Sequence, residues 1–233
     1  LKGDDPSCDL MFSYDGTILT TFMGMDTTDI PEGETLYDFV NETVSEREGL
    51  HMLGKVGLNN TYAIGVTQEV VDTYGVSKIS DLVPIAGELD FGAEHEFFTE
   101  EGSMKYQPFV DFYGLNFHSA VPVDVLKYNA MEEGAFDAMV VYATDGLNKR
   151  VGLTVLEDDR HFFPEYYGAF LVRNDLFDDF YDAAPNLEQV LELLTGQVSS
   201  EEMVELTYAV DVDGRAVQDV AREFLVSKGL LSQ

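Results

Sequence analysis

The chain has 233 residues, of which 45% are apolar and 12% aromatic, so it can bury the core of one or two folded domains. Its 44 acidic and 13 basic residues give a net charge of −31, which disfavours nucleic acids and anionic membrane surfaces as partners. Such a charge favours solubility or suits high salt. A single cysteine, Cys8, excludes an internal disulfide and a cysteine-based zinc site.

No apolar run approaches the roughly 18 residues of a membrane span, and no signal peptide precedes the first strand-like segment. The chain begins with Leu1 rather than Met, and we interpret it as a processed form or an excised domain.

In chain order, the hydrophobic pattern predicts strands alternating with helices. Strands are expected at 8–13, 62–67, 89–93, 117–121, 136–141 and 168–173. Helices are expected at 18–25, 35–48, 68–74, from 80, and at 103–113, 123–133, 187–194, 200–208 and 216–228. The alternation predicts an α/β fold with a mostly parallel sheet.

The stretch 136–167 is the most informative part of the chain. It predicts a buried strand, a turn, a second strand and then a polar corner that ends in paired tyrosines. Tyr142 follows the buried run, and ligands of open α/β sheets lie beyond the carboxyl ends of strands. We therefore expect Tyr142 to contact a ligand.

Support for catalysis is thin. The segment 12–17 resembles the haloacid-dehalogenase phosphatase motif, but Ser13 stands in the place of the nucleophilic aspartate without a base beside it. No histidine spacing fits a metal site, and no glycine-rich nucleotide loop is present. We expect neither a metal nor another cofactor.

Two polar clusters remain as candidate acid/base groups. One is Glu94, His95 and Glu96, and the other is Asp158, Asp159 and His161. Both are more typical of polar loops than of catalytic sites.

Four tyrosines occupy equivalent positions, each at a junction between a strand and a loop: Tyr14, Tyr62, Tyr142 and Tyr166. One such tyrosine is unremarkable, because its ring packs while its hydroxyl stays in water. Four suggest an aromatic cage for a quaternary ammonium ion, where each ring contributes about 0.5–2 kcal/mol when desolvated.

Several motifs, in the same order and spacing, resemble the substrate-binding proteins of ABC importers for glycine betaine, choline and carnitine. They are Tyr14-Asp15-Gly16-Thr17, Asn59-Asn60-Thr61-Tyr62-Ala63, the segment 91–98, Tyr142-Ala143-Thr144-Asp145-Gly146, and the segments 155–164, 201–206 and 220–225. The resemblance runs from about Asp9 to the C-terminus.

This resemblance implies a type II periplasmic-binding-protein fold, in which two α/β lobes joined by two crossing strands close on a ligand. We expect lobe 1 at 1–65 and 168–233 and lobe 2 at 66–167. Relatives carry further elements before the segment that matches Asp9, so the N-terminal part of lobe 1 is expected to be missing. The cage falls on the four tyrosines, and the threonine that contacts the ligand carboxylate falls on Thr17. Tyr167 departs from the family pattern and either lines the site or packs.

The expected function is extracytoplasmic capture of a small quaternary-ammonium compound by a monomer and delivery to ABC permease subunits, without catalysis or nucleic acid binding. The protein is expected to be anchored or fused to its permease. Glycine betaine, choline, carnitine, proline betaine and ergothioneine stay open as ligands. The alternatives are an enzyme on the same scaffold that uses either polar cluster, and a sensor or adhesion-type domain fused to a membrane protein.

Overall fold

The computed structural model describes Leu1 and residues 8–99, 102–123 and 127–232. Residues 124–126 of the helix expected at 123–133 lie outside the described residues.

The chain forms two compact units. Unit 1 comprises Leu1–Asn60, Glu165–Glu202 and Arg222–Gln233, and unit 2 comprises Thr61–Pro164 and Met203–Ala221. The sequence placed the chain crossings a few residues later, and it assigned all of 168–233 to the first lobe. In the structure, residues 203–221 group with unit 2, where the Thr207 hydroxyl accepts a hydrogen bond from the Gly146 N–H at 2.9 Å. Helices α9 (Ser200–Asp211) and α10 (Val217–Ser227) each contain residues of both units.

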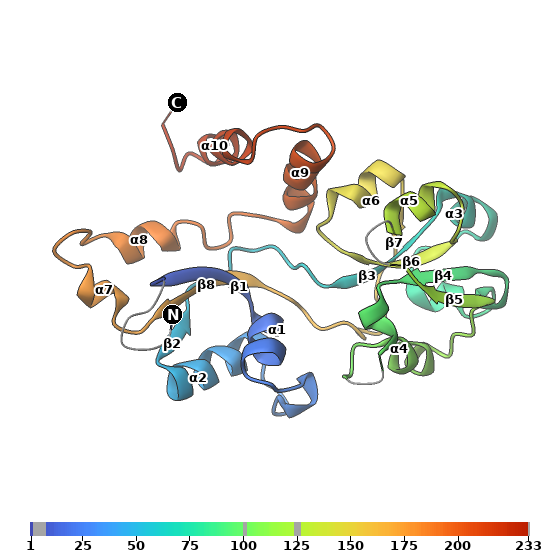
Figure 1. Ribbon diagram of the computed structural model, residues 1–233, viewed down its shortest axis with the longest axis horizontal. Helices are drawn as coiled ribbons and strands as arrows, with labels where there is room; N and C mark the ends of the chain where they lie inside the picture. Colours follow the sequence, from blue (N-terminus) through green and yellow to red (C-terminus); the bar gives the residue numbers. More distant parts are fainter. Residues whose placement is uncertain (2–7, 100–101, 124–126, 233) are drawn as a thin grey trace. The chain divides into compact units, whose positions relative to one another are not determined.

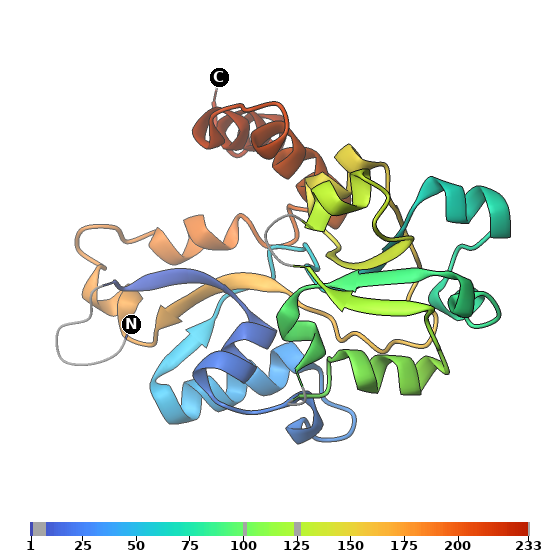
Figure 2. The ribbon, with the colours of Figure 1, turned by 45° about the vertical axis from the view of Figure 1, so that its right-hand side comes forward.

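Unit 1 is built on a three-stranded antiparallel sheet in the order β1 (Leu10–Tyr14), β8 (Gly168–Arg173) and β2 (Leu50–Met52). Alternate residues of β8 face opposite sides. Ala169 and Leu171 pack with buried residues of η1 and α2, whereas Val172 packs with Leu176 of α7. Figures 1 and 2 show α1 and α2 on one face of this sheet. The helical elements of unit 1 outside α9 and α10 are α1 (Asp15–Thr17), the π-helical turn η1 (Ile18–Phe22), η2 (Thr27–Asp29), α2 (Leu36–Glu48), α7 (Leu176–Asp179) and α8 (Leu187–Glu192).

Unit 2 is built on a five-stranded mixed sheet in the order β5 (Ser119–Pro122), β4 (Asp90–Ala93), β6 (Ala138–Tyr142), β3 (Tyr62–Val66) and β7 (Thr154–Val155). One face carries a large aromatic core that contains Phe91 and Phe109, and the other carries a smaller core around Met139. Figure 1 shows α4 on one side of this sheet and α5 and α6 on the other. The helical elements of unit 2 outside α9 and α10 are α3 (Gln68–Tyr74), η3 (Ile79–Leu82), η4 (Ala86–Glu88), η5 (His95–Phe98), α4 (Tyr106–Tyr113), α5 (Lys127–Glu132) and α6 (Gly146–Val151).

The α/β class is confirmed, but the prediction of a mostly parallel sheet is wrong. Among the strands of the described residues, only β4 pairs in parallel, with β5 and with β6, whereas β3 runs antiparallel to both β6 and β7. A continuous apolar run reports burial on both faces of a strand and carries no information on direction.

Several local elements also differ from the prediction. The turn expected after Tyr142 is present at 143–144, but helix α6, which follows it directly, was not predicted; its N-cap Asp145 accepts a hydrogen bond from the Leu147 N–H. The short elements β2 and α7 were not predicted. The helix expected at 18–25 is the π-helical turn Ile18–Phe22, which continues directly from α1.

Candidate functional site

Tyr62 and Tyr142 form a stacked pair in unit 2, and strand register explains why. Tyr62 is the first residue of β3 and Tyr142 the last residue of β6, and the antiparallel register sets these two residues directly opposite each other. Their ring centroids lie 5.2 Å apart with an interplanar angle of 25°. The unit 2 tyrosine pair is thus fixed by backbone pairing.

Two phenylalanines support this pair from the core. The rings of Phe97 and Phe163 meet the Tyr62 ring edge-on, with centroid distances of 5.9 and 6.1 Å. Tyr142 itself is 38% exposed, so it forms the accessible side of the pair. Burial is the main cause that raises the pKa of both hydroxyl groups, so the two rings, already neutral at physiological pH, stay uncharged to higher pH.

Tyr14 and Tyr166 form the corresponding pair in unit 1. Tyr14 ends β1 and lies opposite Gly168, the first residue of β8, and Tyr166 precedes that strand by two residues. The ring centroids are 5.6 Å apart, tilted by 30°. The Tyr166 hydroxyl shares a hydrogen bond of 2.8 Å with Thr17 Oγ1. The structure therefore joins three of the predicted site residues, Tyr14, Thr17 and Tyr166, in one cluster.

Gly16 makes room for the Tyr166 ring. A Cβ added at Gly16 would lie 1.8 Å from a carbon of that ring, which is far inside van der Waals contact. The glycine is required by close approach of the ring rather than by a left-handed backbone.

The backbone around Tyr166 is held by several hydrogen bonds. Asn60 N–H donates to the Tyr166 carbonyl at 2.9 Å, and Tyr166 N–H donates to Asn59 Oδ1 at 2.6 Å. Asp15 N–H donates to the Tyr167 carbonyl, and Tyr167 N–H donates to Asp15 Oδ1, both at 3.0 Å. The motifs that contain Asp15, Asn59 and Asn60 give no sign of this positioning role.

Asp15 is fully buried. Its Oδ1 accepts from two backbone N–H groups, of Gly16 and Tyr167, while Oδ2 accepts no hydrogen bond from the described residues. Burial raises the pKa of Asp15 from 3.8 to about 7, against the opposing effect of those two N–H groups and of the Lys55 charge.

Tyr167 packs against a lysine. Lys55 Nζ lies 4.2 Å from the centroid of the Tyr167 ring and 4.7 Å from that of Tyr37. Tyr167 thus makes a cation–π contact within unit 1.

An ion pair lies beside the unit 2 tyrosine pair and was missed from the sequence. Lys127 Nζ donates to Glu94 Oε1 and lies 5.1 Å from the Tyr142 ring centroid. Lys127 is 7% exposed although it is charged. A lysine inside a predicted amphipathic helix carries no signal of this burial, because lysines at such positions usually extend into solvent.

The carboxylates of the second polar cluster, Asp158 and Asp159, accept hydrogen bonds from other residues of unit 2. Asp158 accepts hydrogen bonds from the Tyr113 hydroxyl and from the Phe162 and Phe163 N–H groups, and Asp159 accepts from Ser80. These carboxylates shape the polar corner, as predicted.

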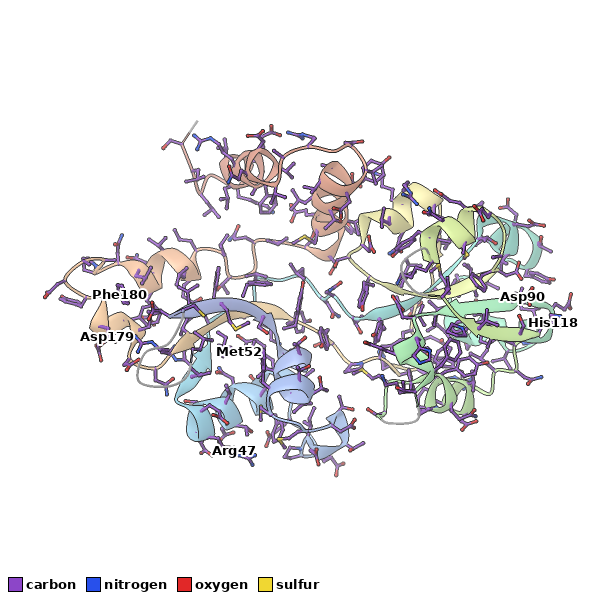
Figure 3. All side chains as sticks on the ribbon, in the orientation of Figure 1. Arg47, Met52, Asp90, His118, Asp179 and Phe180 are labelled. Atoms are coloured by element: carbon purple, nitrogen blue, oxygen red, sulfur yellow. The ribbon has the colours of Figure 1, made fainter. Side chains whose placement is uncertain are left out.

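The histidines are dispersed. His118 precedes β5 and lies near Asp90 (Figure 3). Asp90 is the first residue of β4 and Tyr142 the last residue of the parallel strand β6, so the two lie at opposite ends of the sheet. His51 Nδ1 shares a hydrogen bond with Asn174, and His161 is exposed with φ of 57°. Among the described residues, no group of three or more His, Cys, Asp or Glu side chains could hold a metal ion. None of the described helices combines the length and apolar character needed to cross a bilayer.

Comparison with known proteins gives a consistent result. Residues 5–227 match the family described as the substrate binding domain of the ABC-type glycine betaine transport system. The chain is 30% identical over 231 residues to the ergothioneine transport permease/ergothioneine binding protein EgtU of Helicobacter pylori, covering 99% of this chain and 39% of that protein. It is also 30% identical to the carnitine transport binding protein OpuCC of Listeria monocytogenes, covering 91% of this chain and 67% of the relative.

Solved structures agree with this match. A crystal structure of a glycine betaine/carnitine/choline ABC transporter superposes with a TM-score of 0.82 at 27% identity, over 96% of this chain and 79% of that one. Unliganded YehZ of Escherichia coli, with a TM-score of 0.72 at 22% identity over 96% and 81% of the two chains, supports the fold alone. The predicted family and the type II periplasmic-binding-protein fold are confirmed.

Proposed function

Because the chain belongs to the family of substrate-binding domains of ABC-type glycine betaine transport systems, we propose that it captures a small quaternary-ammonium compound for import. The observation that carries the proposal is the occurrence of one tyrosine pair in each unit, each built at the end of an antiparallel strand pair. Closure of the two units as lobes would enclose one cation with Tyr14, Tyr62, Tyr142 and Tyr166.

The chemistry of the four rings fits such a ligand. A trimethylammonium group offers no N–H donor, so a protein selects it with π faces at centroid distances within about 6 Å. Each desolvated ring contributes about 0.5–2 kcal/mol, and four together suffice for useful affinity. Thr17 Oγ1 would donate to a ligand carboxylate, in exchange for the hydrogen bond that it shares with Tyr166.

The names of the relatives describe transport binding proteins, which supports a role without catalysis. We propose that the protein works outside the cytoplasm as a monomer, anchored or fused to its permease, and hands its ligand to ABC permease subunits. Its ligand is glycine betaine, choline, carnitine or a related compound. The chain spans 39% of the length of the ergothioneine relative, so these statements concern a binding module.

Isothermal titration calorimetry with glycine betaine, choline, carnitine and ergothioneine tests the proposal directly. We expect a saturable heat at a stoichiometry of one with at least one of them. Proline without N-methylation is the matched control, because its ammonium is smaller and better hydrated. Absence of heat with all four compounds, in folded protein, would refute the proposed function.

A further inference from the structure

An ion pair between the buried Lys127 and the half-buried Glu94 lies at the same edge of the unit 2 sheet as the tyrosine pair. Glu94 directly follows β4, and β4 runs parallel to β6, so Glu94 and Tyr142 lie at neighbouring carboxyl ends. The Lys127 and Glu94 side chains are only 8% and 24% exposed. Isolated buried charges are costly, and a pair at a ligand-facing edge calls for a role beyond stability.

Lys127 already uses the aromatic surface that a ligand would need. Its Nζ is 5.1 Å from the centroid of the Tyr142 ring and 5.2 Å from that of Tyr128. It also donates to the Val140 carbonyl at 3.4 Å. A second cation bound to Tyr142 would therefore experience repulsion from this ammonium at close range.

Glu94 has the opposite effect. Its Oε1 accepts from Lys127, whereas Oε2 is buried and accepts no hydrogen bond from the described residues. Three carboxylates, those of Glu94, Glu96 and Asp145, raise the pKa of the Tyr142 hydroxyl through their charge. Glu94 has the largest effect of the three. The carboxylate therefore retains negative potential that can act on a bound cation.

We propose that the Glu94–Lys127 pair sets the charge selectivity of the unit 2 tyrosine pair. Glu94 attracts the quaternary ammonium, and Lys127 limits the affinity for ligands that carry no negative charge of their own. This inference rests on the proposed function and adds a distinction between ligand classes, namely simple cations and zwitterions. A zwitterion senses the pair through both of its charges, so changes at either residue cancel in part for it.

Choline and glycine betaine are the probes, since both carry a trimethylammonium group and only the second carries a carboxylate. With K127M, we expect calorimetry to show a gain of about tenfold in choline affinity and a smaller change for glycine betaine. With E94Q, which leaves the ammonium uncompensated, we expect choline affinity to fall by about tenfold. The E94Q/K127M double variant, with a neutral pair of similar shape, should return the ratio of the two affinities close to that of the wild type.

The opposite signs separate charge selection from a structural role. If the pair only held the fold, both single variants would weaken both ligands to the same extent, and this result would overturn the inference. The control is K149M, which removes an exposed lysine that is paired with Glu205 and lies 4.9 Å from the Tyr208 ring centroid. It makes the same change in net charge and should leave the choline to betaine ratio unchanged.

Two further outcomes decide the remaining cases. If K127M fails to fold, E94Q must still weaken choline more than glycine betaine, and equal weakening refutes the inference. If the wild type binds both ligands but K127M and E94Q do not shift the choline affinity in opposite directions, only this inference is refuted. Absence of binding of all four compounds named above refutes the proposed function together with it.

Discussion

Replacement of Asp15 by asparagine tests the electrostatics of unit 1 most directly. The Asp15 carboxyl is fully buried, and burial raises its pKa from 3.8 to about 7. A carboxyl group whose pKa is raised on folding retains its proton to higher pH than in the unfolded chain. Between pH 4 and 7 the folded chain therefore binds more protons at this residue, and the contribution of Asp15 to the free energy of unfolding falls as the pH rises.

The magnitude follows from the size of that displacement. The raised pKa of Asp15 lowers the free energy of unfolding by about 4 kcal/mol above pH 8 and by about 1.5 kcal/mol at pH 5, as an upper limit. Asparagine removes this penalty and keeps an oxygen that can accept from the Gly16 and Tyr167 N–H groups. Its amide N–H₂ replaces an oxygen that has no partner among the described residues, at a cost of about 1–3 kcal/mol that is independent of pH. The free energy of unfolding of the variant, relative to that of wild type, should therefore increase by on the order of 2 kcal/mol as the pH rises from 5 to 8.

Native-state hydrogen exchange provides the assay, because peptides from β1 and β8 report on unit 1 alone. Comparing variant and wild type at the same pH cancels the intrinsic pH dependence of exchange. The exposed Asp182 gives the control, since D182N makes the same change in charge within unit 1. A difference between D15N and wild type that stays constant from pH 5 to pH 8 would refute the reasoning, because it would mean that Asp15 is ionised in the folded state at both values.

Three other predictions follow from the site and the surface. Y142A should lower affinity for the best ligand by more than about tenfold while Y142F changes it by less than about threefold, since the π face is what binds; calorimetry measures both, and an unchanged value for Y142A would remove this ring from the cage. G16A should displace the Tyr166 ring and weaken binding by about tenfold without unfolding the protein, whereas G87A, whose Cβ would meet nothing closer than 3.8 Å, should bind like wild type in the same titration. The net charge of −31 makes the folded chain repel itself, and salt screens this repulsion. Raising NaCl from about 0.05 to 1 M should therefore raise the melting temperature, measured by circular dichroism, by several degrees. A constant melting temperature would contradict this.

The positions of the four tyrosines could be identified from the sequence, because strand ends are marked by the change from apolar residues to turn formers. Their pairing could not, since it depends on the antiparallel register of β3 with β6 and of β1 with β8. Hydrophobic patterns identify a strand without revealing its direction or its partner.

Lys127 and Asp15 were missed as important residues for a related reason. Both are charged residues of types that usually lie at the surface, and only the folded chain buries them. Local patterns pointed to the four tyrosines, whereas only the resemblance to a family pointed to Thr17. The motifs of that resemblance also contain Asn59 and Asn60, which anchor the backbone of Tyr166.

The discontinuous course of unit 1 has a consequence for the order of folding. Most of unit 2 is the uninterrupted segment 61–164. In unit 1, by contrast, β1 must pair with a strand that is far away in the sequence, since Leu10 lies opposite Val172 of β8. Closing so long a loop is entropically costly unless the intervening chain has already become compact. We therefore expect the Tyr62–Tyr142 pair to form first and the Tyr14–Tyr166 pair only after the chain has returned. Pulsed hydrogen exchange during refolding should show protection of β3 and β6 before β1 and β8, and simultaneous protection would contradict this order.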